Sequence, residues 1–370
     1  MKPLAVIASA MQSPFGDADA TYAALIAGRD AFAPLECAWL LRNDLVAVLP
    51  NHPQDGASWG AWQRQLGVEV GRQALEAASA DRDLDLDKCG CVFATSFGHL
   101  LDQPGQDTMS TWASDCASQL GFTRPPFVAG SGCSSGADAI ALAAALLDRH
   151  CFDTILVVAV DIVTPGKRLA HSLLGTMTSD RVRPFDLARS GMLIGEAAGA
   201  LLMQRSEGPE IAVFELLGVG AANDASGLTA PDQSGLSVRL AIERALLSGS
   251  LDPQDIAVYL AHGTGTELND LTEAKVVAEC FTAHPDLVMM AVKGSIGHSL
   301  GACGLVEFLL LLQALRHGKG APIAGLSDPL ASVADRLHLA APSQLKGQCG
   351  ISVKLGFGGF NSALIARVNG

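Results

Sequence analysis

The stretch FVAGSGCSSGADAIALAAALLDRH, residues 127–150, runs from a short apolar strand through a Gly/Ser turn into a long apolar helix. The same order returns in MAVKGSIGHSLGACGLVEFLLLLQALRHG, residues 290–318. Each copy carries one chemically active residue in its turn, Cys133 in the first and His298 in the second. Because internal self-similarity is the signature of a duplicated unit, we predict that the chain contains two copies of one structural unit.

The rest of the chain alternates short apolar runs, which predict strands, with longer runs of helical periodicity. We expect strands at 4–7, 90–94, 154–160, 199–203, 257–261, 287–292 and 350–353, and helices at 22–26, 62–80, 137–147, 236–247, 273–281 and 305–315. This alternation predicts an α/β layered fold. Turn-forming residues at 206–209 divide it into two halves, 1–207 and 208–370.

Composition indicates a large buried core, since 49% of the 370 residues are hydrophobic and only 17% are charged. So few charges also favour an oligomer, which hides part of the surface. The formal net charge of −13, without a run of Lys and Arg, argues against nucleic-acid binding. The apolar stretch 301–315 contains Glu307 and is shorter than the roughly 20 residues of a membrane span, so we expect a buried core helix and no membrane association.

The nine cysteines are scattered without a disulfide framework or zinc-ligand spacing, so we expect no metal and, apart from one residue, core thiols. The apolar run at residues 3–10 is too short for a signal peptide and is soon followed by polar residues. These features predict a protein of the reducing cytoplasm.

Cys133 is the candidate nucleophile, because a strand-to-helix turn places its sulfur at a helix N-terminus, where N–H groups and the macrodipole stabilise a thiolate. The alternative is a small thiol buried in the core. The flanking Gly132, Ser134, Ser135 and Gly136 leave room for a substrate, which favours the nucleophile.

His262 and His298 are candidate partners of that thiol. His262 lies in AHGTGTELND directly after a predicted strand, where α/β folds gather ligands, and His298 occupies the turn equivalent to that of Cys133. Lys293 follows a buried strand and requires an acidic partner, for which Asp270 and Glu273 are candidates. The two acids also suit the start of a helix.

Two Gly-rich stretches are candidates for binding a substrate or a cofactor. In GFGGFN, residues 356–361, three glycines allow close backbone approach, and the natural use of such a turn is an oxyanion hole. GVGAAN, residues 218–223, looks like half of a dinucleotide loop but lacks the final Gly and the later acid, so we set that interpretation aside.

Together these motifs resemble the elongating β-ketoacyl synthases of fatty-acid and polyketide synthesis, in the thiolase-like superfamily. The resemblance spans the whole chain and rests on five motifs in order: GSGCSSG, RPFDLARSGMLIGEAAG, AHGTGTELND, VKGSIGHSLGACG and KLGFGGFN. It implies a thiolase-like fold in which two pseudo-symmetric βαβαβ halves form a layered α-β-α-β-α body. The activity it implies is decarboxylative Claisen condensation of an enzyme-bound acyl group with malonyl-carrier protein.

The resemblance also assigns roles. Cys133 would carry the acyl group, while His262 and His298 would hold the malonyl thioester and promote decarboxylation. Lys293 and Glu273 would form a supporting charged pair. The other implied roles are an oxyanion hole made by the N–H groups of Cys133 and Phe357, a gate at Phe357, and pantetheine contacts at Thr264, Thr266, Gly356, Phe357 and Gly358.

The implied partners are an acyl carrier protein, which brings its own 4'-phosphopantetheine so that no further cofactor is needed, and a second ketosynthase-like subunit in a homodimer or heterodimer. Three departures from the family pattern stand out: the usual Asn-Ser-Phe is Val353, Lys354 and Leu355, Gly132 replaces Ala, and the chain is short between 98 and 133. Residues 51–62, where members of that family often place carrier-protein contacts, carry no Lys or Arg. We therefore expect docking either on other basic residues, namely Lys167, Arg168, Arg181 and Arg183, or on a partner subunit.

Two other functions stay open at this point. A non-elongating partner subunit, like a chain-length factor, typically lacks the nucleophile that this chain retains as Cys133. A thiolase-type acyltransferase acting on coenzyme A normally has a second Cys near its C-terminus, but GFGGFN has none, and Cys349 lies before the last predicted strand.

Overall fold

The structure is a computed structural model that describes residues 1–53, 58–80, 84–105, 107–206, 212–227, 229–337 and 341–369. The predicted boundary between the halves, at residues 207 and 208, lies outside these residues. One ten-stranded mixed sheet runs through the molecule in the order β10-β9-β13-β14-β8-β1-β7-β6-β4-β5. Its strands are β1 Leu4–Gln12, β4 Cys89–Ala94, β5 Phe127–Ala129, β6 Thr154–Asp161, β7 Ala197–Arg205, β8 Phe214–Asn223, β9 Ile256–Leu260, β10 Val288–Met290, β13 Cys349–Leu355 and β14 Phe360–Val368.

The sheet shows the internal repeat directly. In the first half, the strands of this sheet lie side by side in the order β1-β7-β6-β4-β5, and in the second half in the order β8-β14-β13-β9-β10. Numbered along the chain within each half, both series read first, fifth, fourth, second and third. The first three strands of each series are antiparallel and the last pairings are parallel. The halves join where Leu4–Val6 of β1 pairs with Phe214–Leu216 of β8. The prediction of two pseudo-symmetric halves is confirmed.

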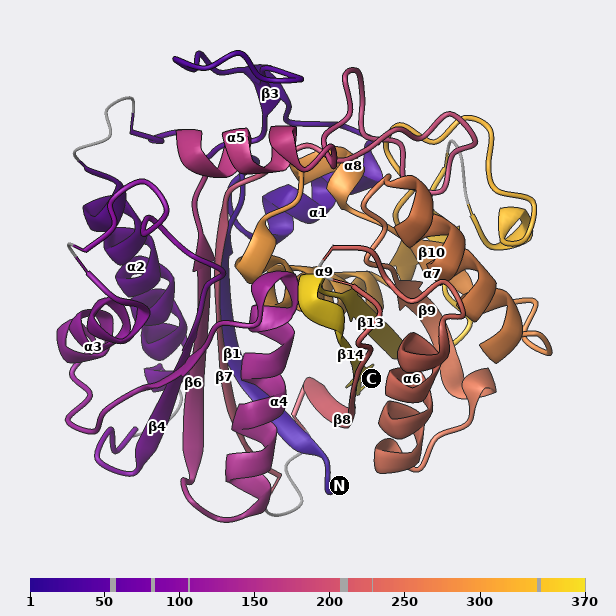
Figure 1. Ribbon diagram of the computed structural model, residues 1–370. Helices are drawn as coiled ribbons and strands as arrows, with labels where there is room; N and C mark the ends of the chain where they lie inside the picture. The colour runs from indigo at the N-terminus through magenta and orange to yellow at the C-terminus, as the bar shows by residue number, and fades with distance from the viewer. Residues whose placement is uncertain are drawn as a thin grey trace.

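The helices form three layers around the two halves of the sheet (Figure 1). α2 and α3 cover the outer face of one half, α6 and α7 cover the other, and α4 and α9 pack against each other between them. The helices are α1 Ala18–Ile26, α2 Trp59–Ser79, α3 Met109–Gln119, α4 Ser135–Asp148, α5 Pro165–Leu173, α6 Leu236–Gly249, α7 Glu267–Cys280, α8 Lys293–Ile296 and α9 Cys303–His317. Two small ribbons, β2 Ala33–Pro34 with β3 Leu45–Val46 and β11 Lys319–Gly320 with β12 Ser343–Gln344, lie outside the main sheet. This is the predicted layered α-β-α-β-α body of the thiolase-like fold.

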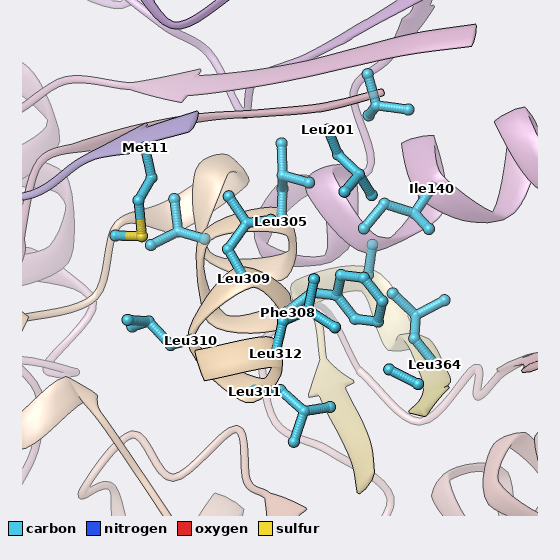
Figure 2. Packing of buried hydrophobic residues seen from close by; sticks show 14 of the residues in the cluster. Met11, Ile140, Leu201, Leu305, Phe308, Leu309, Leu310, Leu311, Leu312 and Leu364 are labelled. Atoms are coloured by element: carbon cyan, nitrogen blue, oxygen red, sulfur yellow. The ribbon is translucent and has the colours of Figure 1, made fainter. Parts of the chain in front are cut away.

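Helix α9 is the centre of the core. Leu305, Phe308 and the run Leu309–Leu312 are each at most 3% exposed, and they pack against Met11, Ile140, Leu201 and Leu364 (Figure 2). By length and composition, the segment Leu300–His317, which includes α9, is apolar enough to span a membrane. However, 83% of this segment is buried inside the protein. The prediction of a buried core helix is confirmed. Each buried leucine contributes about 1.5–3 kcal/mol to the stability of the layer.

Strand β8 explains the stretch GVGAAN. A Cβ atom at Gly218 would lie 2.2 Å from the carbonyl oxygen of Ala245, and one at Gly220 would lie 2.0 Å from that of Ala241. The two glycines therefore let α6 approach the sheet closely, in a strand that the apolar-run criterion missed. Strand β14 and helices α3, α5 and α8 were missed as well. Apart from Cys133, the expectation of core thiols holds for five of the eight cysteines, whereas Cys151 is exposed and two others are half-buried.

Candidate active site

Cys133 lies in the turn between β5 and α4, as predicted. The turn is a short 3-10 segment, Gly132–Ser134, and Gly132 has a φ of +67°, which favours glycine. The thiol is buried, and the backbone N–H groups of Phe357 and of Cys133 itself each lower the pKa of the thiol. These are the two N–H groups assigned to the oxyanion hole, so the predicted donors converge on the predicted nucleophile.

Burial also changes the pKa of the Cys133 thiol, which the sequence did not predict. Desolvation raises the pKa of its thiol to about 11, although the N–H of Phe357 and the charge of Lys293 both lower it. Burial outweighs the local donors and therefore opposes the thiolate that the helix N-terminus was expected to stabilise. At neutral pH the resting group is a thiol.

The second repeat carries an equivalent turn, but His298 is not the residue at the position of Cys133. The 3-10 segment Leu300–Ala302 precedes α9 as Gly132–Ser134 precedes α4, and Leu300 has a positive φ of 44° like Gly132. The residue that matches Cys133 is thus Gly301, where a Cβ atom would lie 2.2 Å from the backbone nitrogen of Ser96. His298 lies just before this turn and reaches the site from there.

His262 and His298 face each other with ring centroids 5.3 Å apart. The N–H of Leu300 lies 3.2 Å from Nδ1 of His298, and the ammonium of Lys293 lies 3.3 Å from Nδ1 of His262. Burial, followed by the charge of Lys293, holds the pKa of each imidazole well below its usual range. Each neutral ring accepts at Nδ1, so its proton is on Nε2 and is available for donation.

Lys293 pairs with Glu307 rather than with the predicted Glu273. Its Nζ lies 2.6 Å from Oε1 of Glu307, and both side chains are almost fully buried. Glu273 instead accepts the N–H groups of His262 at 2.8 Å and Gly263 at 2.9 Å, and the hydroxyl of Tyr259 at 3.0 Å. Burial raises its pKa to about 7. Glu273 therefore fixes the backbone of the His262 turn.

The second candidate partner of Lys293, Asp270, also holds backbone. Its carboxylate accepts the N–H groups of Phe185 at 2.7 Å and Gly265 at 3.2 Å, and burial raises its pKa to about 6. Helix α7 begins at Glu267, earlier than predicted, so Asp270 lies in its first turn, as the alternative interpretation expected, whereas Glu273 lies beyond it. Both acids also anchor the turn that precedes the helix.

Sequence reasoning missed the function of Glu307 and the position of Lys354. Nζ of Lys354 lies 2.6 Å from Oε2 of Glu307, so one carboxylate is flanked by two ammonium groups. The available signal was a single acid in the otherwise apolar helix α9, which requires a buried cation. His171 was also missed: its ring lies 6.0 Å from that of Phe357, and burial lowers its pKa to about 4.

The group His262, Cys303 and Glu307 brings three ligand atoms within 4.8 Å of one another, as a metal centre would. The ammonium groups of Lys293 and Lys354 already occupy the surroundings of the Glu307 carboxylate. A divalent cation would meet two positive charges there, so the donor set does not fit a metal.

A pocket of about 480 Å³ leads to the two histidines. The hydroxyls of Thr264 and Thr266, to which the resemblance assigns pantetheine contacts, lie 2.8 Å apart in its wall. Phe357 and Gly356 also line it, whereas Gly358 lies on the exposed side of its turn, with a φ of +80°. Cys133 is not among the lining residues. Phe357 lines the pocket, and the turn Phe357–Gly359 contacts the turn that carries Cys133.

The basic residues considered for docking differ in accessibility. Lys167 and Arg168 are buried: Lys167 pairs with Asp161, and Arg168 donates to three backbone carbonyls of residues 35–44. They cannot form a docking surface, which corrects that part of the prediction. Arg181 is exposed, and Arg183 is half-buried and paired with Asp180 at 2.7 Å.

Comparisons with known proteins agree with the fold. Residues 1–208 match the beta-ketoacyl synthase N-terminal domain, and residues 213–327 match the beta-ketoacyl synthase C-terminal domain. The chain therefore belongs to the beta-ketoacyl synthase family, a family of condensing acyltransferases in fatty-acid and polyketide synthesis.

Individual relatives are more distant. The chloroplastic 3-oxoacyl-[acyl-carrier-protein] synthase II of Arabidopsis thaliana is 33% identical over 67% of this chain, and the match spans about half (48%) of that relative. The whole chain also superposes on a ketosynthase in complex with its type II polyketide acyl-carrier protein, with a TM-score of 0.88 at 18% identity over 100% of both chains. A Xenorhabdus doucetiae ketosynthase in complex with its chain length factor gives 0.85 at 23% identity, covering 100% of this chain and 98% of that one.

Proposed function

We propose that this chain is a catalytically active, elongating β-ketoacyl synthase that carries the growing acyl group on Cys133. The observation that carries the proposal is that the two N–H groups assigned to the oxyanion hole, from Cys133 and Phe357, both act on the buried Cys133 thiol. The two candidate histidines face each other with ring centroids 5.3 Å apart, and both rings are neutral. A non-elongating subunit would have no use for this arrangement, and the structure retains all of it.

In the acyl-transfer step, the Cys133 sulfur attacks the thioester carbonyl of an acyl carrier protein as its proton leaves. The carbonyl oxygen becomes an oxyanion between the N–H groups of Cys133 and Phe357, where preorganised donors stabilise it. The C–S bond to the carrier's pantetheine then breaks, and the pantetheine thiolate takes up a proton. The acyl group remains on Cys133.

In the condensation step, the Nε2–H groups of His262 and His298 hold the thioester oxygen of malonyl-carrier protein. Loss of carbon dioxide leaves an enolate, whose negative oxygen these two donors stabilise. The enolate carbon attacks the acyl carbonyl on Cys133, the new C–C bond forms and the C–S bond breaks. The Cys133 thiolate is released and regains a proton from solvent.

The partners that we propose follow from the same geometry. The pocket beside Thr264 and Thr266 fits the pantetheine arm of an acyl carrier protein, and the arm arrives with its carrier rather than as a resident cofactor. The second partner is another ketosynthase-like subunit, in a homodimer or heterodimer. Solved ketosynthases of this fold pair with an acyl carrier protein or a chain length factor, which supports both proposals.

Intact-mass analysis tests the assignment of the nucleophile. After incubation with a panel of acyl carrier proteins, the wild-type chain should gain the mass of one acyl group, and Cys133→Ala should gain none. Cys116→Ala and Cys151→Ala, one buried and one exposed thiol, should both acylate normally. An adduct that survives in Cys133→Ala would contradict the proposal.

A further inference from the structure

Lys354 is a buried cation to which neither proposed reaction step assigns a role. It lies in β13, directly before the turn that carries Phe357, and its side chain is fully buried. Its Nζ donates to the carbonyl of Val353 at 2.8 Å and forms the 2.6 Å ion pair with Oε2 of Glu307. A buried lysine without a function is costly, because desolvation of an ammonium is repaid only by close partners.

The carboxylate of Glu307 divides its two oxygens between two lysines. Oε1 pairs with Lys293, whereas Oε2 has no hydrogen bond within the part of the chain that the structure describes, so its stabilisation is the charge of Lys354. Two ammonium groups and one carboxylate leave this cluster with one net positive charge. Lys293 is the member that also contacts Nδ1 of His262.

Several elements present titratable groups to the two histidines. These are Lys293 on α8, Lys354 on β13, Glu307 and Cys303 on α9, Glu273 on α7 and His171 on α5. Lys293 and Lys354 are the cations among them, and each lowers the pKa of both imidazoles. Glu273 faces the backbone of His262 and is held by N–H donors.

We propose that Lys354 is a positioning residue: its charge adds to burial and to the charge of Lys293 in keeping His262 and His298 neutral, and by occupying Oε2 of Glu307 it leaves Lys293 directed at His262. Without Lys354, Glu307 and Lys293 would form a neutral pair, and no net positive charge would oppose protonation of the imidazoles. A protonated imidazole needs a hydrogen on Nδ1, which would displace the contacts from Lys293 and Leu300. The catalytic consequence rests on the proposed function; the effect on histidine protonation does not.

The test replaces Lys354 by Met, which keeps the length of the side chain and removes its charge. In Lys354→Met the pKa of the histidines should rise. The acid limb of the pH–rate profile for decarboxylation of malonyl-carrier protein should therefore move to higher pH by roughly one unit. The double variant Lys354→Met/Glu307→Gln restores one net positive charge and should return the limb toward its wild-type position. Lys346→Met, which removes an exposed lysine paired with Asp286, is the matched control and should leave the limb unchanged.

Histidine NMR titration on the same variants gives a readout that needs no activity. An imidazole signal that titrates at higher pH in Lys354→Met than in wild type supports the proposal, even if malonyl-carrier protein is not a substrate. Absence of decarboxylation in wild type at every pH would count against the proposed function alone. An unchanged acid limb and unchanged histidine titration in Lys354→Met, with an equal loss of rate at all pH values, would overturn the role of Lys354. If Lys354→Met does not fold, Lys354→Gln takes its place under the same criteria.

Discussion

Cys133 combines two environments that act on its thiol in opposite directions. Two backbone N–H groups are aimed at the sulfur, yet burial raises its pKa to about 11. Because only the thiolate is strongly nucleophilic, a buried thiol of this kind is protected until a substrate enters and the proton can leave. Reactivity at Cys133 should therefore report its pKa directly.

Alkylation by iodoacetamide provides that report. Since the pKa of Cys133 is raised, its thiolate fraction at neutral pH is small, and its rate of alkylation should increase about tenfold per pH unit between pH 7 and pH 10. Mass spectrometry of the labelled peptides should show this slope at Cys133. A rate that is already maximal at pH 7 would mean that the thiolate is the resting state.

Asp138 is, besides Glu307, Lys354 and His171, a further residue that sequence reasoning did not single out. From the first turn of α4 it accepts hydrogen bonds from the hydroxyls of Ser131 and Ser134, which flank the nucleophile. Ser134 in turn lies beside Gly356, where a Cβ atom would be 3.2 Å from its hydroxyl oxygen. Asp138 therefore connects the nucleophile turn to the oxyanion turn.

Asp138→Ala should slow acylation of Cys133 by about tenfold or more, because a small displacement of either turn misplaces an oxyanion donor. Asp138→Asn, which can still accept one of the two hydroxyls, should lose less. Stopped acylation reactions analysed by intact mass give both rates. Wild-type rates in both variants would show that the turns hold their geometry without this carboxylate.

At the scale of elements, sequence patterns predicted the two strand–turn–helix units well because their signals are local. Small residues mark each turn, and the apolar run of α9 predicts a buried helix. The pairing of Lys293 was not predictable in the same way, since α9 brings Glu307 to it only after the helix has packed against β13. Strand β8 was missed because its glycines serve the approach of α6 rather than a turn.

The contact between α4 and α9 has a specific requirement for small residues. A Cβ atom at Gly304 would lie 2.3 Å from the backbone nitrogen of Ala137, which no side-chain movement can relieve. Gly304→Ala should therefore lower the free energy of unfolding by about 2 kcal/mol or more. Gly67→Ala in α2, where the nearest atom is 3.4 Å away, should be neutral or slightly stabilising. Denaturant unfolding of both variants checks this, and equal effects would contradict the packing argument.

At the scale of the whole molecule, β5 closes one end of the sheet. Within the described residues it pairs only with β4, and Phe127 on it is 39% exposed. An open strand edge with an exposed aromatic side chain invites pairing with another chain, unless it is covered. The low charged fraction that suggested an oligomer is consistent with a covered edge.

We predict that the protein is a dimer at micromolar concentration and that Phe127→Asp weakens the dimer while leaving the far-UV circular dichroism unchanged. Light scattering coupled to size-exclusion chromatography measures both species. A stable wild-type monomer that stays monomeric with every candidate ketosynthase-like partner would count against this prediction.

The division of labour between Cys133 and the two histidines is the central claim, and separate measurement of carbon dioxide release and acyl-enzyme formation tests it most directly. Cys133→Gln, whose amide mimics an acylated cysteine, should keep or increase decarboxylation of malonyl-carrier protein without condensation. His298→Ala should still accept an acyl group on Cys133 but lose decarboxylation by roughly two or more orders of magnitude, about the effect of removing one oxyanion donor. Decarboxylation by His298→Ala at the wild-type rate would contradict the account and reduce His298 to a structural residue.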